Sequence, residues 1–169
     1  MDTIVYWARK IGASCFFLGY FPFASGTVAS FATITMLWFL KDDLSFILGP
    51  QNALNYWWVI VTITAISFFL CDRGKEVFGE DDPKQAVFDE FVGQMITFFM
   101  VPISLRTLIL GFVLFRFFDI VKPFPVYRLE EIEGGVGVTM DDVAAGIQAN
   151  VTLMSMIWAY EWIMVYLVL

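Results

Sequence analysis

Long apolar segments separated by short polar breaks run through most of the chain, and this pattern predicts membrane-length helices. The breaks hold charged residues, glycine or proline, which are the usual stop signals of helices, as at Lys41-Asp42-Asp43 and at Pro102. The predicted spans are approximately Thr27–Leu40, Ala53–Cys71, Ala86–Val101, Thr107–Val121, and a last one from Asp142 or Val143 to the C-terminus.

The N-terminal segment has a different pattern. Residues 3–19 mix aromatic and aliphatic side chains with Arg9 and Lys10, which is typical of an amphipathic helix lying at a membrane interface. Pro22 and Gly26 interrupt the next stretch, where a serine or threonine could cap the following helix. The free N–H groups of that helix would favour an anion, and the alternative is a plain capped turn.

The third and fourth predicted spans are shorter than the roughly 20 apolar residues of a full membrane crossing. We therefore expect these two helices to tilt little, to thin the bilayer or to lie in a compact bundle.

The composition supports a membrane protein. Hydrophobic residues make up 59% of the 169 residues, the mean hydropathy is +0.74, and only 16% of the residues are charged, against about a quarter in soluble domains. We therefore predict an all-α, integral membrane helical bundle of about five spans plus an N-terminal interfacial helix, forming a single domain over residues 1–169. The net charge of −7 argues against nucleic acid as a partner.

Lysine and arginine residues predict the orientation, because they concentrate on the cytoplasmic side of membrane proteins. Only Lys41 and Arg106 flank one side of the five predicted spans, so the other side is expected to be cytoplasmic. Most basic residues flank that second side: Arg9, Lys10, Arg73, Lys75, Lys84, Lys122 and Arg128.

Acidic side chains at the cytoplasmic ends of the predicted spans are the first candidates for chemistry, since ionisable groups beside membrane segments by default indicate function. On a helical wheel of the third span, the polar and small residues fall within an arc of about 140°. They are Asp89, Glu90, Gly93, Gln94 and Thr97. The alternative is that the glycine only permits packing and that the acids only suit the helix dipole.

A second group of ionisable residues surrounds the end of the fourth span. Arg116 and Asp119 are spaced to pair across one turn, so a structural ion pair is an alternative to a functional role. Lys122 precedes a proline and is expected to project as a phosphate-binding charge. A glycine-rich loop over residues 134–137 is then expected to lead to Asp141-Asp142 at the head of the last span.

The residue types restrict the chemistry. The chain has no histidine, which excludes phosphatases with a histidine nucleophile, and its two cysteines have no metal-binding spacing. Carboxylate oxygens without histidine or cysteine ligands suit Mg²⁺, Mn²⁺ or Ca²⁺ rather than zinc.

Three motifs resemble the phosphatidylglycerophosphatase A family. They are Ala86–Gly93 (AVFDEFVG), Phe115–Pro125 (FRFFDIVKPFP) and Gly134–Gly146 (GGVGVTMDDVAAG). Residues 22–30 are similar to a Pro-Gly-Thr-x-Gly-Ser segment of the family, although Ser25 replaces its proline and Ala29 its glycine. The resemblance covers residues 19–146 in the family's order and spacing.

The resemblance implies a phosphoric monoester hydrolase that converts phosphatidylglycerol phosphate to phosphatidylglycerol and inorganic phosphate in phospholipid biosynthesis. It implies Mg²⁺ as cofactor and a bacterial inner-membrane, multi-pass location with the active site facing the cytoplasm. Its partners would be the phospholipid substrate and the membrane, and a homo-oligomer is compatible with the sequence. Carried over by motif, the acidic residues that matter would be Asp89, Glu90, Asp119, Asp141 and Asp142, and the family's lysine would be Lys122; the resemblance does not divide the acids between metal ligands and general base. Our own assignment takes Asp89, Glu90, Asp119 and Asp142 as catalytic and all five acids as candidate metal ligands. The expected substrate-binding residues are Lys122, Arg116, Gly26 and Thr27.

Two other function classes compete with this interpretation. An ion-coupled transporter with a carboxylate cation site would also place acids in membrane segments, but no inverted repeat is visible. A membrane assembly factor could use the acidic loops to bind a partner. Phosphate release from lipid would separate the enzyme from both.

Overall fold

The computed structural model describes residues 1–80, 83–132 and 134–168, and the regular elements among them are helices joined by turns and loops. No strand occurs within these residues, which confirms the all-α prediction. The α-helices are α1 (Thr3–Ala13), α2 (Ser25–Leu40), α3 (Ala53–Cys71), α4 (Gly74–Phe78), α5 (Phe88–Thr97), α6 (Leu105–Val121), α7 (Val126–Glu130) and α8 (Gly135–Val168), with 3-10 turns at Leu18–Tyr20 and Pro50–Asn52.

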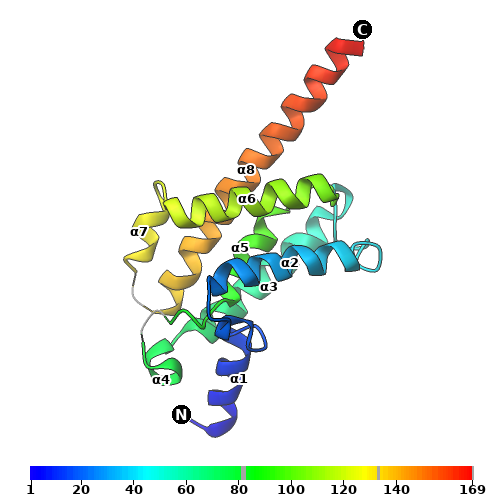
Figure 1. The fold of residues 1–169 in the computed structure, drawn as a ribbon. Helices are drawn as coiled ribbons and strands as arrows, with labels where there is room; N and C mark the ends of the chain where they lie inside the picture. Colours follow the sequence, from blue (N-terminus) through cyan, green and yellow to red (C-terminus); the bar gives the residue numbers. More distant parts are fainter. Residues whose placement is uncertain (81–82, 133, 169) are drawn as a thin grey trace.

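Helix α5 lies at the centre of the bundle and packs against α2, α3, α6 and α8 (Figure 1). It is shorter than the third predicted span, since it ends at Thr97 and the chain turns through Met100, whose φ is +57°. Ten residues give a helix of about 15 Å, half of the roughly 30 Å hydrocarbon core of a bilayer. By itself, α5 is therefore a buried core helix and too short for a crossing.

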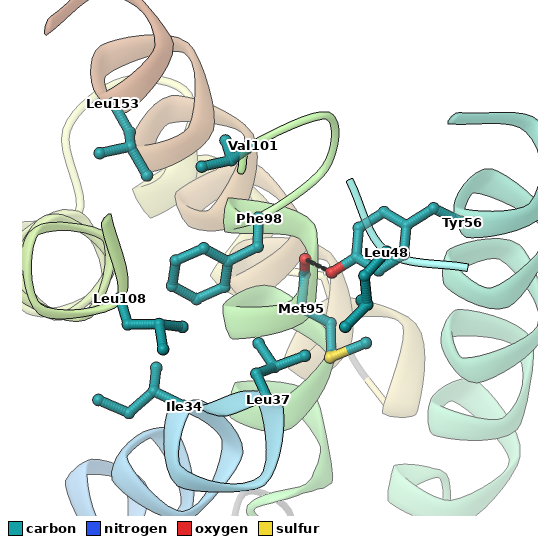
Figure 2. Packing of buried hydrophobic residues seen from close by; sticks show 9 residues of the cluster. All are labelled: Ile34, Leu37, Leu48, Tyr56, Met95, Phe98, Val101, Leu108 and Leu153. Atoms are coloured by element: carbon teal, nitrogen blue, oxygen red, sulfur yellow. Dashed lines mark hydrogen bonds between the residues drawn. The ribbon is translucent and has the colours of Figure 1, made fainter. Parts of the chain in front are cut away.

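The largest core cluster surrounds the C-terminal end of α5 (Figure 2). Phe98 and Met95 pack there between side chains of α2, α3, α6 and α8. The hydroxyl of Tyr56 donates a hydrogen bond of 2.8 Å to the carbonyl oxygen of Met95, so α3 is tied to α5 inside the core. This packing fixes the far end of α5 and leaves its N-terminal end, with Asp89 and Glu90, for the site.

Helix α8 begins earlier than the last predicted span. Gly135 already belongs to the helix, so the expectation of a flexible loop over residues 134–137 is wrong. The first turn packs tightly instead: a Cβ on Gly137 would lie 1.7 Å from the carbonyl oxygen of Ile132, and one on Gly135 would lie 2.3 Å from the backbone nitrogen of Asp72. Glycine is needed there for close approach, and Asp141-Asp142 lie within the helix rather than at its start.

The C-terminal half of α8 extends beyond the rest of the bundle (Figure 1). Its large apolar side chains are exposed, for example Trp158 and Leu167 at 71% and 75%. Within the described residues, one helical segment, Pro50–Cys71, is long and apolar enough to cross a membrane by length and composition. The five predicted spans thus correspond to helices of unequal length, and α4 and α7 occupy parts of the connecting loops.

The predicted interfacial helix corresponds to α1, but one of its two basic residues points inward. Arg9 is buried, its Nη1 donates a hydrogen bond to the carbonyl oxygen of Asp72, and its guanidinium lies 4.4 Å from the centre of the Phe69 ring. Arg9 therefore joins α1 to the end of α3 and is not an interfacial anchor.

Candidate functional site

A cleft of about 350 Å³ opens where the N-terminal ends of α2, α5 and α8 meet the C-terminal end of α6. The side chains that line it are mostly polar, and six of the described ones are carboxylates. Five of these belong to residues that the sequence motifs predicted, and the sixth belongs to Glu131, which precedes α8. The lining comprises Ser25, Pro83, Lys84, Ala86, Asp89, Glu90, Asp119, Lys122, Glu131, Ile132, Gly134, Val138, Asp141 and Asp142.

Three carboxylates converge at the inner end of this cleft. Asp89 and Glu90 lie in the first turn of α5 and Asp142 lies near the start of α8, and one oxygen from each falls within 4.8 Å of the others. Asp89 and Asp142 are only 5% and 4% exposed. Buried, mutually close carboxylates repel one another, so this arrangement requires either protons or a cation.

Two of these carboxylates keep an unused oxygen. Oε2 of Glu90 and Oδ1 of Asp142 are buried and have no hydrogen-bond partner among the described residues. A buried polar atom without a partner is costly. Together with the all-oxygen donor set, these atoms fit a hard divalent cation such as Mg²⁺, which binds carboxylates.

A close crossing of α5 and α8 brings the carboxylates together. A Cβ on Gly146 would lie 2.4 Å from the carbonyl oxygen of Gly93, so the two backbones touch at these glycines. Asp89 and Asp142 each lie one helical turn before the glycine of their own helix, on the same side as that glycine. The crossing therefore places the two aspartates opposite each other.

Asp119 lies in the same cleft but is engaged by its own helix. Oδ2 of Asp119 lies 2.7 Å from Nη1 of Arg116, and both side chains are 16% exposed. Nη1 is not aligned for a hydrogen bond, and Nε of Arg116 has no partner among the described residues either. The structure thus contains the ion pair that the spacing suggested, and it keeps Asp119 beside the three converging carboxylates.

Asp141 is likewise paired, here with the lysine of the KPFP motif. Nζ of Lys122 donates a hydrogen bond of 2.9 Å to Oδ2 of Asp141. Lys122 has a left-handed backbone with φ of +47°, which ends α6 at the cleft. The pair joins α6 to α8 and holds one positive charge in the cleft.

The N-terminal end of α2 lies at the site, but without the serine or threonine cap that the sequence suggested. Among the described residues no side chain caps this helix, whose N-cap residue is Ala24. Gly26 packs directly on the site, since a Cβ there would lie 2.1 Å from Oε1 of Glu90 and 3.3 Å from Nη1 of Arg116. Thr27 does not line the cleft in the described part of the chain.

Sequence reasoning missed Ser25 and Lys84 as residues that line the cleft. The Ser25 hydroxyl donates a hydrogen bond of 2.7 Å to the carbonyl oxygen of Lys84, so the first residue of α2 is tied to the loop before α5. Lys84 lies in a loop of mixed charge, which is usually a solvated surface. Only its position two residues before the AVFDEFVG motif could have indicated a role.

Cys15 lies near the site but is not a nucleophile. Burial and the nearby Glu90 raise the pKa of the Cys15 thiol to about 12. The thiol stays protonated at neutral pH, and a protonated thiol is a poor nucleophile.

Comparison with known proteins gives a consistent result. The profile of the family described as Phosphatidylglycerophosphatase A matches residues 11–157. A Bacteroides thetaiotaomicron protein with the provisional name phosphatidylinositol-3-phosphatase is 37% identical over 145 residues, which cover 83% of this chain and 87% of the relative.

Two further relatives are named phosphatidylglycerophosphatase A. The one from Haemophilus influenzae is 39% identical over 101 residues, covering 56% of this chain and 62% of the relative. The one from Escherichia coli K12 is 32% identical over 131 residues, covering 76% and 72%. No solved structure matches the chain significantly.

Proposed function

The chain belongs to the phosphatidylglycerophosphatase A family, and from this premise we propose that it is a Mg²⁺-dependent lipid phosphatase of phospholipid biosynthesis. The reaction is hydrolysis of the phosphomonoester of phosphatidylglycerol phosphate to phosphatidylglycerol and inorganic phosphate. The observation that carries this proposal is the convergence of Asp89, Glu90 and Asp142 in a cleft that also holds two cationic groups.

The three converging carboxylates are the residues that would hold the cation. They supply only hard oxygen donors, and two of them keep a buried oxygen without a partner in the described residues. When bound, Mg²⁺ would neutralise charge on the phosphoryl oxygens and make a nearby water more acidic. The sequence motifs also included Asp119 and Asp141 as ligands, but each of these has a basic partner of its own.

Hydrolysis moves the phosphoryl group from the glycerol oxygen to water. Water attacks phosphorus, the bond between phosphorus and the glycerol oxygen breaks, and the glycerol oxygen takes up a proton. Asp119 lines the cleft and is oriented by Arg116, which supports its assignment as the carboxylate that accepts the proton of the attacking water. Lys122, held by Asp141, would offset the negative charge that develops on the phosphoryl oxygens.

An ion-coupled transporter is less consistent with the arrangement of the ionisable groups. A transport path requires such groups at successive depths between the two faces of the membrane. The carboxylates of α5, α6 and α8 instead lie around one cleft at one end of the bundle, while the opposite end of α5 lies in an apolar core.

The family is membrane-associated, and we propose that this chain is a multi-pass protein of the bacterial inner membrane. The exposed apolar side chains of α3 and of the second half of α8 support membrane contact. The basic residues of α4, α7 and Lys122 lie at the same end as the cleft, which supports a cytoplasmic site.

The proposal is tested by phosphate release from lipids in mixed micelles by the purified full-length chain. Phosphatidylglycerol phosphate, phosphatidylinositol 3-phosphate and phosphatidic acid are compared as substrates at equal surface concentration. We expect the highest kcat/KM for phosphatidylglycerol phosphate. Faster release from the inositol lipid would favour the activity named for the Bacteroides relative, and no release from any of the three would refute a lipid phosphatase.

A further inference from the structure

A second cleft, of about 510 Å³, adjoins the carboxylate cleft. It is formed by the turn over residues 19–25 together with Lys84 and Gln85, and it shares Ser25 and Lys84 with the first cleft. A ligand that fills both clefts would therefore pass over these two shared residues.

The two clefts differ in charge. The first contains the carboxylates of α5, α6 and α8, which repel any anion that is not bound to a cation. The described lining of the second contains no carboxylate, and its one charged residue is Lys84. Lys84 is exposed and forms no ion pair with the described residues, in contrast to Lys122, which is paired with Asp141.

The backbone that carries Lys84 is held firmly. Its carbonyl oxygen accepts the hydrogen bond from Ser25. The following residue packs against the turn, because a Cβ on Gly19 would lie 2.0 Å from the carbonyl oxygen of Gln85. The lysine side chain thus starts from a fixed point between the clefts, and the half-exposed Phe21 adds an apolar side chain to the lining of the second cleft.

The substrate under the proposed function has a matching distribution of charge. Phosphatidylglycerol phosphate carries a phosphomonoester and a phosphodiester, joined by a glycerol. We propose that the second cleft is a phosphodiester subsite, in which Lys84 binds the phosphodiester while the monoester reaches the carboxylate cleft. This inference rests on the proposed function and extends it to substrate selection.

The subsite explains how lipids would be distinguished. Phosphatidylinositol 3-phosphate also carries a monoester and a diester joined by a polyol, whereas phosphatidic acid carries a monoester alone. Lys84 would therefore contribute to the binding of the first two lipids and not to that of phosphatidic acid. Because a lysine ammonium binds phosphate as a point charge, Lys84 would bind a phosphodiester whether glycerol or inositol joins it to the monoester.

The test compares Lys84→Gln, Lys84→Arg and the control Lys41→Gln. Lys41 follows the opposite end of α2 and lies over the Trp38 ring, so its replacement removes the same charge away from both clefts. The measurements are kcat and KM for phosphatidylglycerol phosphate and the inhibition constants of two soluble probes. Glycerophosphoglycerol carries only the diester, and inorganic phosphate represents the monoester.

We expect Lys84→Gln to raise the KM for phosphatidylglycerol phosphate about tenfold, since one charge-assisted hydrogen bond is lost. The inhibition constant of glycerophosphoglycerol should rise by about the same factor for the same reason. The kcat and the inhibition constant of inorganic phosphate should stay within about twofold of wild type, as for a residue that contributes uniform binding. Lys84→Arg should restore most of the binding, and Lys41→Gln should leave all four constants unchanged.

Two results would overturn the subsite. One is an equal rise of both inhibition constants, which would assign Lys84 to the monoester, and the other is no change in either. A wild-type protein that releases no phosphate from the lipid would instead refute the proposed function, and the subsite with it.

Discussion

Among single residues, Asp119 combines a structural role, as the partner of Arg116, with a proposed catalytic role in the cleft. Its pairing with Arg116 at 2.7 Å stabilises the end of α6, and its position in the cleft suits proton transfer to or from water. A purely structural Asp119 would be dispensable once its partner is removed, whereas a catalytic one would not. Removing both members of the pair separates these roles.

We predict that Asp119→Asn reduces turnover about 10²–10⁴-fold, the usual contribution of a general base. It should also lower the melting temperature, because breaking a fully buried ion pair costs about 3–5 kcal/mol, and somewhat less at 16% exposure. In the Arg116→Leu/Asp119→Asn protein, stability should largely return while turnover stays low. Recovery of phosphatase activity in that double variant would show that Asp119 is structural.

Asp89 and Asp142 are expected to act as one unit. If both hold the same cation, Asp89→Asn and Asp142→Asn should each reduce turnover about 10³-fold or more, and the double variant should be scarcely slower, as for residues that act together. Each single variant should also need a higher Mg²⁺ concentration for half-maximal rate. Multiplicative losses with an unchanged Mg²⁺ requirement would contradict a shared site.

The sequence predicted the acidic residues better than the residues around them. Asp89, Glu90 and Asp142 are recognisable because adjacent acids at the head of an apolar segment are unusual. Ser25 and Lys84 were missed, because a serine in a turn and a lysine in a charged loop are ordinary at the sequence level. The two ion pairs also differ in how well the sequence predicts them. The spacing of three residues along α6 predicts the pair of Arg116 and Asp119, whereas only the folded chain reveals the pair of Lys122 and Asp141.

At the scale of helices, the crossing of α5 and α8 determines the geometry of the site. Backbone contact at Gly93 and Gly146 leaves no space for a side chain between the helices. The aspartates one turn away are therefore held at a separation that the glycines fix.

We predict that Gly146→Ala pushes α8 away from α5, destabilises the protein by about 1–3 kcal/mol through overpacking, and weakens activation by Mg²⁺. The matched control is Gly12→Ala in α1, whose new Cβ would meet only the flexible end of the Leu70 side chain, at 2.7 Å. The control should keep wild-type Mg²⁺ activation. A Gly146→Ala protein with unchanged melting temperature and unchanged Mg²⁺ response would contradict the role of the crossing.

Comparison of the predicted and observed helix bounds shows which helices the sequence pattern predicts accurately. The bounds of α3 agree with the second predicted span, and those of α2 and α6 differ from prediction by one turn or less, since apolar runs between clear breaks define all three. The start of α8 was not predictable, because three glycines in four residues usually indicate a loop, whereas here Gly135 and Gly137 lie in the helix and permit close packing. The end of α5 at Thr97 was not predicted, because the apolar run continues to the break at Pro102.

For the molecule as a whole, the position of the cleft relative to the membrane can be tested by labelling. In a protein with Cys15 and Cys71 replaced by alanine, new cysteines at the exposed positions Glu76, Arg128 and Asp43 report on both ends of the bundle. We expect a membrane-impermeant reagent to label Asp43→Cys in intact cells, and Glu76→Cys and Arg128→Cys only after lysis. Labelling of Arg128→Cys in intact cells would place the cleft outside.

Under the proposed function, hydrolysis of the lipid phosphomonoester requires a divalent cation bound by the carboxylate cluster. The most direct measurement is phosphate release from phosphatidylglycerol phosphate by the purified full-length chain, first in EDTA and then after Mg²⁺ is restored, with Asp89→Asn as the control. We predict that EDTA abolishes turnover, that Mg²⁺ restores it in the wild-type protein, and that Asp89→Asn stays about 10³-fold or more below wild type when Mg²⁺ is restored. Full turnover in EDTA, or an Asp89→Asn protein as active as wild type, would contradict the requirement for a cation bound by these carboxylates.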